Sequence, residues 1–255
     1  MGVLGGKRAV VWGVANKRSV AWGIAQALHR EGAALALTFQ NERVEKMARE
    51  CADQIPDTLL LRADVEDEDQ IQSVYEQLSK QWERLDIIVH SLAFAPAEEL
   101  KGRFLDTSRR GFLTALEVST YSLIPVTKHA LPLMTEGGSV MTMTHIGSSR
   151  VFPSYNVMGV AKAALEATVR YLAADVGPEN VRVNAISAGT MSTLAARGIP
   201  NFMDMHRQSS SRSPLRRQTD QAEVGDTAVF LASPLSRAIT GEVIFVDQGF
   251  HVLGV

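Results

Sequence analysis

The sequence predicts an α/β fold built on one doubly wound parallel sheet of about seven strands. Short runs rich in β-branched residues alternate along the chain with stretches of amphipathic helical pattern, which is the rhythm of repeated βαβ units. The runs are apolar on both faces, as strands are when helices cover both sides of a parallel sheet. No internal repeat or Ser/Pro-rich linker interrupts the chain, so we expect a single Rossmann-type domain over 1–255.

Seven short segments are the predicted strands: RAVVWG (8–13), ALALTFQ (34–40), DTLLLRADV (57–65), LDIIVHSLAF (85–94), GSVMTMTH (138–145), NVRVNAISAG (180–189) and EVIFVDQG (242–249). Amphipathic helices are predicted between them, near 19–31, 41–55, 67–82, 107–135, 155–177 and 220–232. The segment 190–219 breaks the alternation because it is long, polar and rich in serine. We interpret it as a surface excursion or as a loop that covers substrate.

Composition narrows the class of protein. The chain has a formal net charge of −2 and no long Lys/Arg block, so nothing indicates nucleic-acid binding. Its single cysteine, Cys51, permits neither an internal disulfide nor a cysteine-rich metal site, and we predict no metal. No secretion signal and no run of about 18 apolar residues is present, so we expect a soluble, cytoplasmic protein without a membrane partner.

Ligands of doubly wound sheets bind beyond the carboxyl ends of the strands, and the turn after the first strand suits a nucleotide. Gly13 is small enough for a backbone to approach a diphosphate there. Ser19 is placed to cap the next helix and to present a hydroxyl at its positive end. Gly23 would let that helix pack closely against the sheet. The alternative is an ordinary strand–turn–helix, because the full G-x-G-x-x-G pattern is missing.

The second strand ends at Gln40, where many NAD enzymes carry an acidic residue that grips the adenosine ribose. An amide can bond the ribose hydroxyls but carries no positive charge for a 2′-phosphate. Arg43 is the one basic candidate before Lys46, so we favour NADH over NADPH.

The ends of the next two strands extend the predicted cofactor site. Asp64 offers a carboxylate to the adenine amino group and Val65 an apolar neighbour to the ring, unless Asp64 only caps a helix. Small residues stand where ribose and nicotinamide would lie after the fourth strand: Ser91, Leu92 and Ala93.

Tyr155 and Lys162 are the candidate catalytic pair. Seven helical residues return almost to the same azimuth with a rise of ~10.5 Å, so the phenol and the ammonium would share one helix face. Such a tyrosine can protonate a substrate oxygen, and such a lysine can hold a cofactor sugar and supply positive potential. The spacing alone is a weak indication, because a helix face with a solvated lysine has the same pattern.

Together these segments resemble one known family. Gln40 and the motifs GVANKRSVAWGIAQAL, ADVED, HSLAFAP, SYNVMGVAKAALEATVRYLAADVGP, VRVNAISAG and ITGEVIFVDQG are similar to those of the NADH-dependent enoyl-acyl-carrier-protein reductases. These enzymes are a divergent branch of the short-chain dehydrogenase/reductases, and the likeness runs nearly end to end. It implies reduction of trans-2-enoyl thioesters in fatty acid elongation, with acyl carrier protein as partner. It also implies a homotetramer, which agrees with the apolar faces of 113–134 and 155–176.

The resemblance implies roles for individual residues. Tyr155 would contact the thioester oxygen, Lys162 the nicotinamide ribose, and the backbone at Ala95 the substrate. The segment after Ala195 would cover the substrate. The dinucleotide would be lined by Gly13, Ser19, Val20, Gln40, Asp64, Val65 and Leu92, and by Met191, Ser192, Thr193, Leu194 and Ala195.

Three positions mark this chain off from related patterns. Met158 stands where ordinary short-chain dehydrogenases have their tyrosine, and it cannot donate a proton, which argues against an alcohol dehydrogenase. His145 stands where the enoyl reductases generally carry a second tyrosine. A neutral imidazole can replace that donor, with an ordinary pKa near ~6.5, or it is simply tucked against its loop. Thr190 replaces a usual proline and frees the backbone.

Two other functions stay open on this basis. One is a related reductase with a different substrate, such as a carbonyl compound or an enoyl-CoA. The other is a paralogue that binds NADH but has impaired turnover because of His145.

Overall fold

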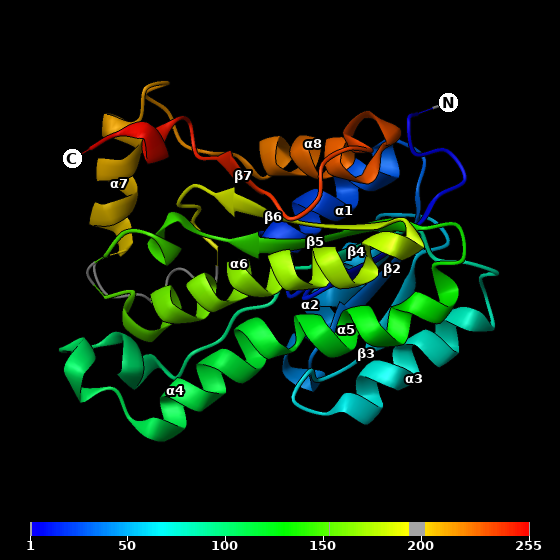
Figure 1. The fold of residues 1–255 in the computed structure, drawn as a ribbon, viewed down its shortest axis with the longest axis horizontal. Coiled ribbons are helices and arrows are strands. Elements are labelled where there is room, and N and C mark those ends of the chain that lie inside the picture. The colour runs from blue at the N-terminus through cyan, green and yellow to red at the C-terminus, as the bar shows by residue number, and fades with distance from the viewer. Residues whose placement is uncertain (1, 153, 194–201, 255) are drawn as a thin grey trace.

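A computed structural model describes residues 2–152, 154–193 and 202–254. Seven parallel strands form one sheet in the order β3-β2-β1-β4-β5-β6-β7, so the direction of winding reverses between β1 and β4 (Figure 1). The predicted fold class is confirmed. The strands are β1 (Arg8–Trp12), β2 (Ala34–Phe39), β3 (Leu59–Arg62), β4 (Ile87–His90), β5 (Gly138–Thr144), β6 (Val181–Ala188) and β7 (Val243–Val246).

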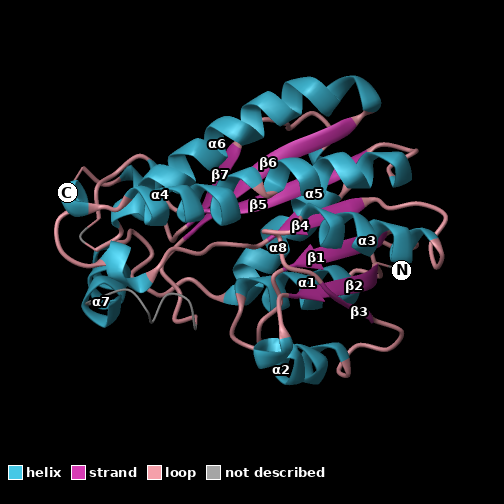
Figure 2. Cartoon of the chain, turned by 90° about the horizontal axis from the view of Figure 1, so that it is seen from below, coloured by secondary structure: helices cyan, strands magenta, loops and turns pink. Residues whose placement is uncertain are grey.

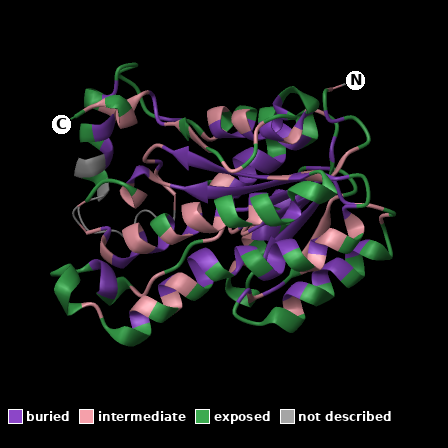
Figure 3. Cartoon of the chain, in the orientation of Figure 1, coloured by how far each residue is buried: buried purple, intermediate pink, exposed green. Residues whose placement is uncertain are grey.

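Helices cover both faces of this sheet (Figures 1 and 2). Apolar side chains of α1 (Val20–Arg30), α2 (Glu42–Ala52) and α8 (Gln221–Ala232) form one layer of the core. The opposite layer is formed by α3 (Glu68–Ser79), α5 (Leu123–Ala130) and α6 (Asn156–Val176). Figure 3 shows the strands buried between these layers, as their apolar residues require, and the exposed positions on the outer helix surfaces.

Helices α1 and α8 pack unusually close although they come from opposite ends of the chain. A Cβ added to Gly23 would lie 2.6 Å from the Cβ of Gln221, so only glycine fits there. The Gln221 amide also donates to the carbonyl oxygen of Ser19 over 3.1 Å. The sequence predicted that Gly23 lets α1 pack closely against the sheet. The element that packs against Gly23 is instead α8, so that prediction is wrong.

The segment 107–135 is not one helix. It divides into α4 (Arg109–Leu116), a π-turn (Glu117–Tyr121) and α5. Pro125 explains part of the break, because it has no N–H to donate to the carbonyl of Tyr121. The hydroxyl of Ser122, beside the turn, donates to the carbonyl oxygen of Val118 four residues earlier, a local bond that competes with regular helix.

The segment 190–219 contains a helix, α7 (Phe202–Arg212), which lies at the carboxyl end of the sheet (Figure 1). Its described buried side chains are polar: His206, Ser209 and Ser213 beside its end. These described positions therefore carry no apolar signal for a helix. Among the described residues, no helix is both long and apolar enough to cross a membrane.

Candidate active site

Tyr155, Lys162 and His145 meet where β5 ends and α6 begins. The ring centroids of His145 and Tyr155 are 5.0 Å apart, and those of His145 and Phe152 are 5.3 Å apart. Lys162 is buried, and its Nζ donates to the carbonyl oxygen of Met143 over 2.7 Å. The structure thus brings all three candidate catalytic side chains to one place at the carboxyl end of the sheet.

The backbone around Tyr155 is strained. Tyr155 is the residue before α6, so it stands at the helix boundary rather than inside the helix. Its neighbours Ser154 (φ 63°) and Asn156 (φ 38°) are both left-handed, which is uncommon outside glycine. The Asn156 amide donates to the carbonyl oxygen of Glu99 over 3.2 Å, and this bond helps to hold the unusual turn.

Burial shapes the protonation of the pair. Tyr155 packs with Leu100, Ala115 and Met158, and this apolar environment raises the pKa of its phenol well above the usual range. Burial lowers the pKa of Lys162 from 10.5 to about 8, an effect that the negative charge of Glu166 opposes. Tyr155 therefore keeps its proton at neutral pH, and Lys162 remains mainly an ammonium.

His145 is held in one neutral tautomer. Its Nδ1 accepts from the N–H of Gly147 over 3.0 Å, so the proton belongs on Nε2, which makes no hydrogen bond to the described residues. Burial, and next the charge of Lys162, lower the pKa of His145 to about 4. The expected titration near the ordinary value is therefore wrong. The histidine does contact its own loop, but through one nitrogen only, and the other can act as a donor.

The turn after β1 has the predicted local structure. Ser19 caps α1 by accepting from the N–H of Trp22 over 3.3 Å, and its hydroxyl donates to the carbonyl oxygen of Asn16. Gly13 is left-handed (φ 91°), and a Cβ there would lie 2.4 Å from the carbonyl oxygen of Ser91. Glycine is thus needed where the turn touches the loop after β4.

The ends of β2 and β3 are joined by side chains. The Gln40 amide donates to the Asp64 carboxylate over 3.1 Å. Asp67, rather than Asp64, caps α3, so the alternative in which Asp64 is a simple helix cap is wrong. Val65, the next residue after Asp64, is buried. The two polar side chains predicted for the adenosine end are therefore neighbours, and the apolar residue predicted with them follows directly in the chain.

A cavity of ≈ 290 Å³ lies beside the start of α1 and the end of β6. It is lined by Arg18, Met191, Ser192 and the segment 218–221. Arg18 was not among the predicted residues, although its place directly before the helix cap was a usable signal. A cation beside a helix N-terminus suits an anionic diphosphate, so the residues present fit a dinucleotide.

The other predicted site residues are placed as follows, except for two that lie outside the described residues. Val20 begins α1, Thr193 follows Ser192, and the loop after β4 carries Ser91, Leu92, Ala93 and Ala95. Ala95 packs on the apolar cluster that contains Tyr155. Leu194 and Ala195 lie outside the described residues.

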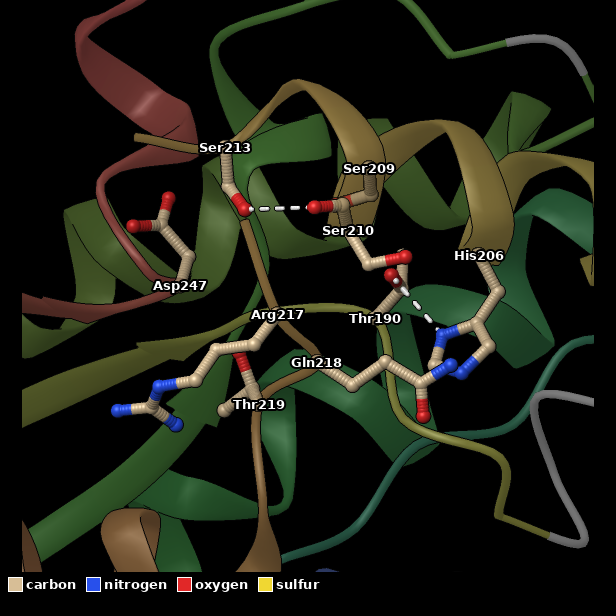
Figure 4. Close-up of a pocket in the computed structure, with 9 residues that line it drawn as sticks. All are labelled: Thr190, His206, Ser209, Ser210, Ser213, Arg217, Gln218, Thr219 and Asp247. Atoms are coloured by element: carbon tan, nitrogen blue, oxygen red, sulfur yellow. Dashed lines mark hydrogen bonds between the residues drawn. The ribbon is translucent and has the colours of Figure 1, made fainter. Parts of the chain in front are cut away.

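Thr190 contacts α7. Its hydroxyl lies 3.4 Å from Nδ1 of His206, and the two side chains point toward each other in a small polar pocket that Asp247 also lines (Figure 4). A proline at position 190 would have no hydroxyl to offer. This departure from the usual pattern therefore adds a contact between the end of β6 and α7.

The sheet order, the capped turn after β1 and the Tyr155–Lys162 arrangement define a short-chain dehydrogenase/reductase. The family model for Enoyl-(Acyl carrier protein) reductase matches residues 13–251, and the chain belongs to that family.

Proteins named as enoyl-[acyl-carrier-protein] reductases are similar to this chain over nearly their whole length. The enoyl-[acyl-carrier-protein] reductase [NADH] of Bacillus cereus is 50% identical over 100% of both chains, and that of Nostoc sp. is 49% identical over 99% of both. A crystal structure of the Bacillus cereus reductase with NADP+ and indole naphthyridinone has a TM-score of 0.98, with 100% of each chain covered and 49% identity. The Anaplasma phagocytophilum reductase, solved with NAD, has a TM-score of 0.96 at 45% identity, covering 100% of this chain and 97% of its own.

Proposed function

We propose that this protein is an enoyl-[acyl-carrier-protein] reductase that uses NADH to reduce trans-2-enoyl thioesters to saturated acyl thioesters. The observation that carries the proposal is the meeting of Tyr155, Lys162 and His145 at the end of β5, in a chain about half identical to reductases of this name from end to end. The reaction belongs to fatty acid elongation.

The geometry disfavours an ordinary alcohol dehydrogenase. The position that would supply the phenol in that class is Met158, which is buried and lies with its sulfur 3.8 Å from the hydroxyl of Ser119. A thioether has no proton to give. Acid chemistry at this site therefore falls to Tyr155, one turn earlier.

NADH, when bound, supplies the hydride for the β-carbon of the enoyl group. Tyr155 would donate a hydrogen bond to the thioester oxygen, where negative charge develops as the enolate forms, and would give that oxygen its proton. Its raised pKa keeps the phenol protonated before that moment. The resulting enol becomes the saturated thioester when its α-carbon takes up a proton and the oxygen loses one, and the phenol regains its proton from solvent. Nε2 of His145 offers a second, neutral donor to the same oxygen. The donor pair stabilises the enolate more than the neutral substrate, which is the condition for a faster chemical step.

Lys162 would hold the nicotinamide ribose, and its ammonium would add positive potential beside Tyr155. The diphosphate would lie at the start of α1, near Gly13, Ser19, Val20 and Arg18. Gln40, Asp64 and Val65 would hold the adenosine. The nicotinamide end would be bordered by Ser91, Leu92, Ala93, Met191, Ser192, Thr193, Leu194 and Ala195.

The substrate side is proposed to be formed by Ala95 and Tyr155, under a cover that includes α7. The Thr190–His206 contact supports this placement, because it ties α7 to the end of β6 beside the site. The partner would be acyl carrier protein bearing the enoyl chain, and the location cytoplasmic.

A homotetramer is proposed as the working assembly. Apolar side chains are exposed in two regions: Leu113, Tyr121 and Tyr171 on the α4–α6 side, and Leu235, Phe245 and Val252 near β7. Tyr171, on α6, is 81% exposed in the single chain. Two separate apolar surfaces suit the two kinds of interface in a tetramer of twofold axes.

The function is tested by adding crotonyl-CoA or crotonyl-acyl carrier protein to the protein with NADH. The oxidation of NADH is followed as the loss of its absorbance. Rapid oxidation of NADH with the carrier-protein substrate is expected. Turnover of crotonyl-CoA alone, or of a carbonyl compound instead, would favour the related reductase. Tight NADH binding without turnover of either thioester would favour the other alternative, a paralogue that binds NADH but has impaired turnover because of His145.

NADH is expected to exceed NADPH in kcat/KM by about tenfold or more, because a 2′-phosphate would find no charge-assisted partner, and such bonds are worth roughly 1.5–3 kcal/mol. Gln40 is bonded instead to the Asp64 carboxylate, which would repel the phosphate. Gln40→Arg should narrow the difference, while Gln54→Arg, at an exposed position just after the end of α2, should not. Steady-state rates with both cofactors measure it. Equal wild-type efficiency would contradict the prediction, and Arg43→Gln would then show whether Arg43 holds the phosphate.

His145→Phe is expected to lower kcat/KM about tenfold by removing one neutral donor from the enolate. Because the folded pKa is about 4, the imidazole stays neutral above pH 5.5, so the ratio of wild type to variant should be constant from pH 5.5 to 8. His145→Tyr should restore the rate. If the ratio of wild-type to variant kcat/KM instead changed with pH, with a midpoint near the ordinary histidine pKa, His145 would not act as a neutral donor. Equal rates for wild type and His145→Phe would make the histidine structural.

A further inference from the structure

The π-turn between α4 and α5 carries buried hydroxyl groups that bond to segments around the active site. Ser119 and Thr120 lie within the turn and Ser122 directly follows it; all three are buried. Single π-turns inside helices are costly and occur frequently at functional sites. The partners of these hydroxyls show what this turn holds in place.

Ser119 fixes the loop that follows β4. Its Oγ accepts from the N–H of Phe94 over 2.9 Å and donates to the carbonyl oxygen of the same residue over 3.0 Å. Among the described residues, these two are the only hydrogen bonds made by residues 92–95. One hydroxyl therefore satisfies both backbone groups of Phe94, in a loop that has no sheet partner there.

The held loop borders the reacting centre. Phe94 precedes Ala95, which packs on the cluster containing Tyr155 and Met158. The neighbouring hydroxyl, of Thr120, donates to the carbonyl oxygen of Ala161 over 2.8 Å, one residue before Lys162. The π-turn is thus bonded on one side to the loop that would touch substrate and on the other to the helix that carries the catalytic lysine.

We propose that Ser119 is a positioning residue: its hydroxyl holds the backbone of Phe94 and Ala95 at the separation from Tyr155 that productive binding of the enoyl thioester requires. This rests on the proposed function, since the loop matters for rate only if substrate lies against it. Misplacement of reacting groups by about 1 Å costs about 100-fold in rate, so loss of this tether has a measurable cost.

The test compares Ser119→Ala with Thr127→Val. Thr127 is an equally buried hydroxyl in α5, but it bonds only to the carbonyl oxygen of Leu123 in its own helix. Both variants should lose similar thermal stability. Only Ser119→Ala should lose about tenfold in kcat/KM for crotonyl-acyl carrier protein, with the Kd for NADH changed less than about twofold. An equal loss of activity in both variants would overturn the proposal and leave Ser119 structural.

Amide hydrogen exchange gives a readout that needs no turnover. In Ser119→Ala the amide of Phe94, whose N–H donates to Ser119 in wild type, should exchange about tenfold faster, whereas Thr127→Val should leave it unchanged. Unchanged exchange at Phe94 would overturn the tether. If wild type oxidised no NADH with either crotonyl thioester, the proposed function would fail, and the exchange rates would still decide whether Ser119 holds the loop.

Discussion

Tyr155→Phe is expected to lower kcat by about 100-fold or more, because a positioned general acid typically contributes at least that factor. The phenol is needed mainly when charge develops on the thioester oxygen, so ground-state binding should change little. The Kd for NADH should stay within about twofold of wild type, since the ring and its contacts with His145 remain. Steady-state kinetics and fluorescence titration with NADH measure the two quantities.

Tyr75→Phe is the matched control for this change. Tyr75 is also a buried tyrosine, but its hydroxyl donates to the carbonyl oxygen of Val126 in the neighbouring helix α5. Its loss should lower the melting temperature and leave kcat within about twofold of wild type. If Tyr155→Phe retained the wild-type kcat, the acid would have to be sought elsewhere, first at His145.

Lys162→Ala should weaken NADH binding by about 10- to 100-fold and lower kcat as well, because hydrogen bonds from a charged donor are worth roughly 1.5–3 kcal/mol. This sets it apart from Tyr155→Phe, which should affect turnover alone. Lys128→Ala removes an exposed lysine paired with Glu68 and should change neither quantity. Unchanged NADH affinity in Lys162→Ala would contradict a ribose-binding role.

The same lysine predicts a pH dependence of cofactor binding. Burial lowers its pKa from 10.5 to about 8, so its ammonium form declines as pH rises through that value. NADH should bind the ammonium form more tightly, and its Kd in the wild type should therefore rise between pH 7 and 9.5. In Lys162→Ala this rise should disappear.

The fold was predictable because its signals are local. Seven apolar runs and the helices between them gave the sheet, and the cap at Ser19 followed from one hydroxyl at the start of an apolar period. Helix α7 escaped because its described buried face is polar, at His206 and Ser209, and periodicity detects only apolar faces. The break of the predicted helix 107–135 at the π-turn was not predicted, because the groups bonded to the turn lie far away in sequence, at Phe94 and Ala161.

The candidate site was predictable by position but not by chemistry. Spacing placed Tyr155 and Lys162 together, yet the left-handed residue on each side of Tyr155 has no sequence signal apart from the small polar side chains of Ser154 and Asn156. The neutral state of His145 depends on the N–H of Gly147 and on burial, both of which are tertiary. Likewise, Gly13 suggested a diphosphate, whereas its closest neighbour is the carbonyl of Ser91.

The close packing of α1 against α8 joins residues that are 202 positions apart in the chain, as Ser19 and Gln221 are. A ribosome makes α1 first and must add the whole segment up to Ala232 before α8 exists. During that interval the face of α1 that carries Gly23 and Ala27 lacks the helix that covers it in the finished core. Contacts of such long sequence separation slow folding and prolong exposure of apolar surface. This layer of the core therefore closes only after α8 has been made, and the α1 face that it covers stays exposed until then.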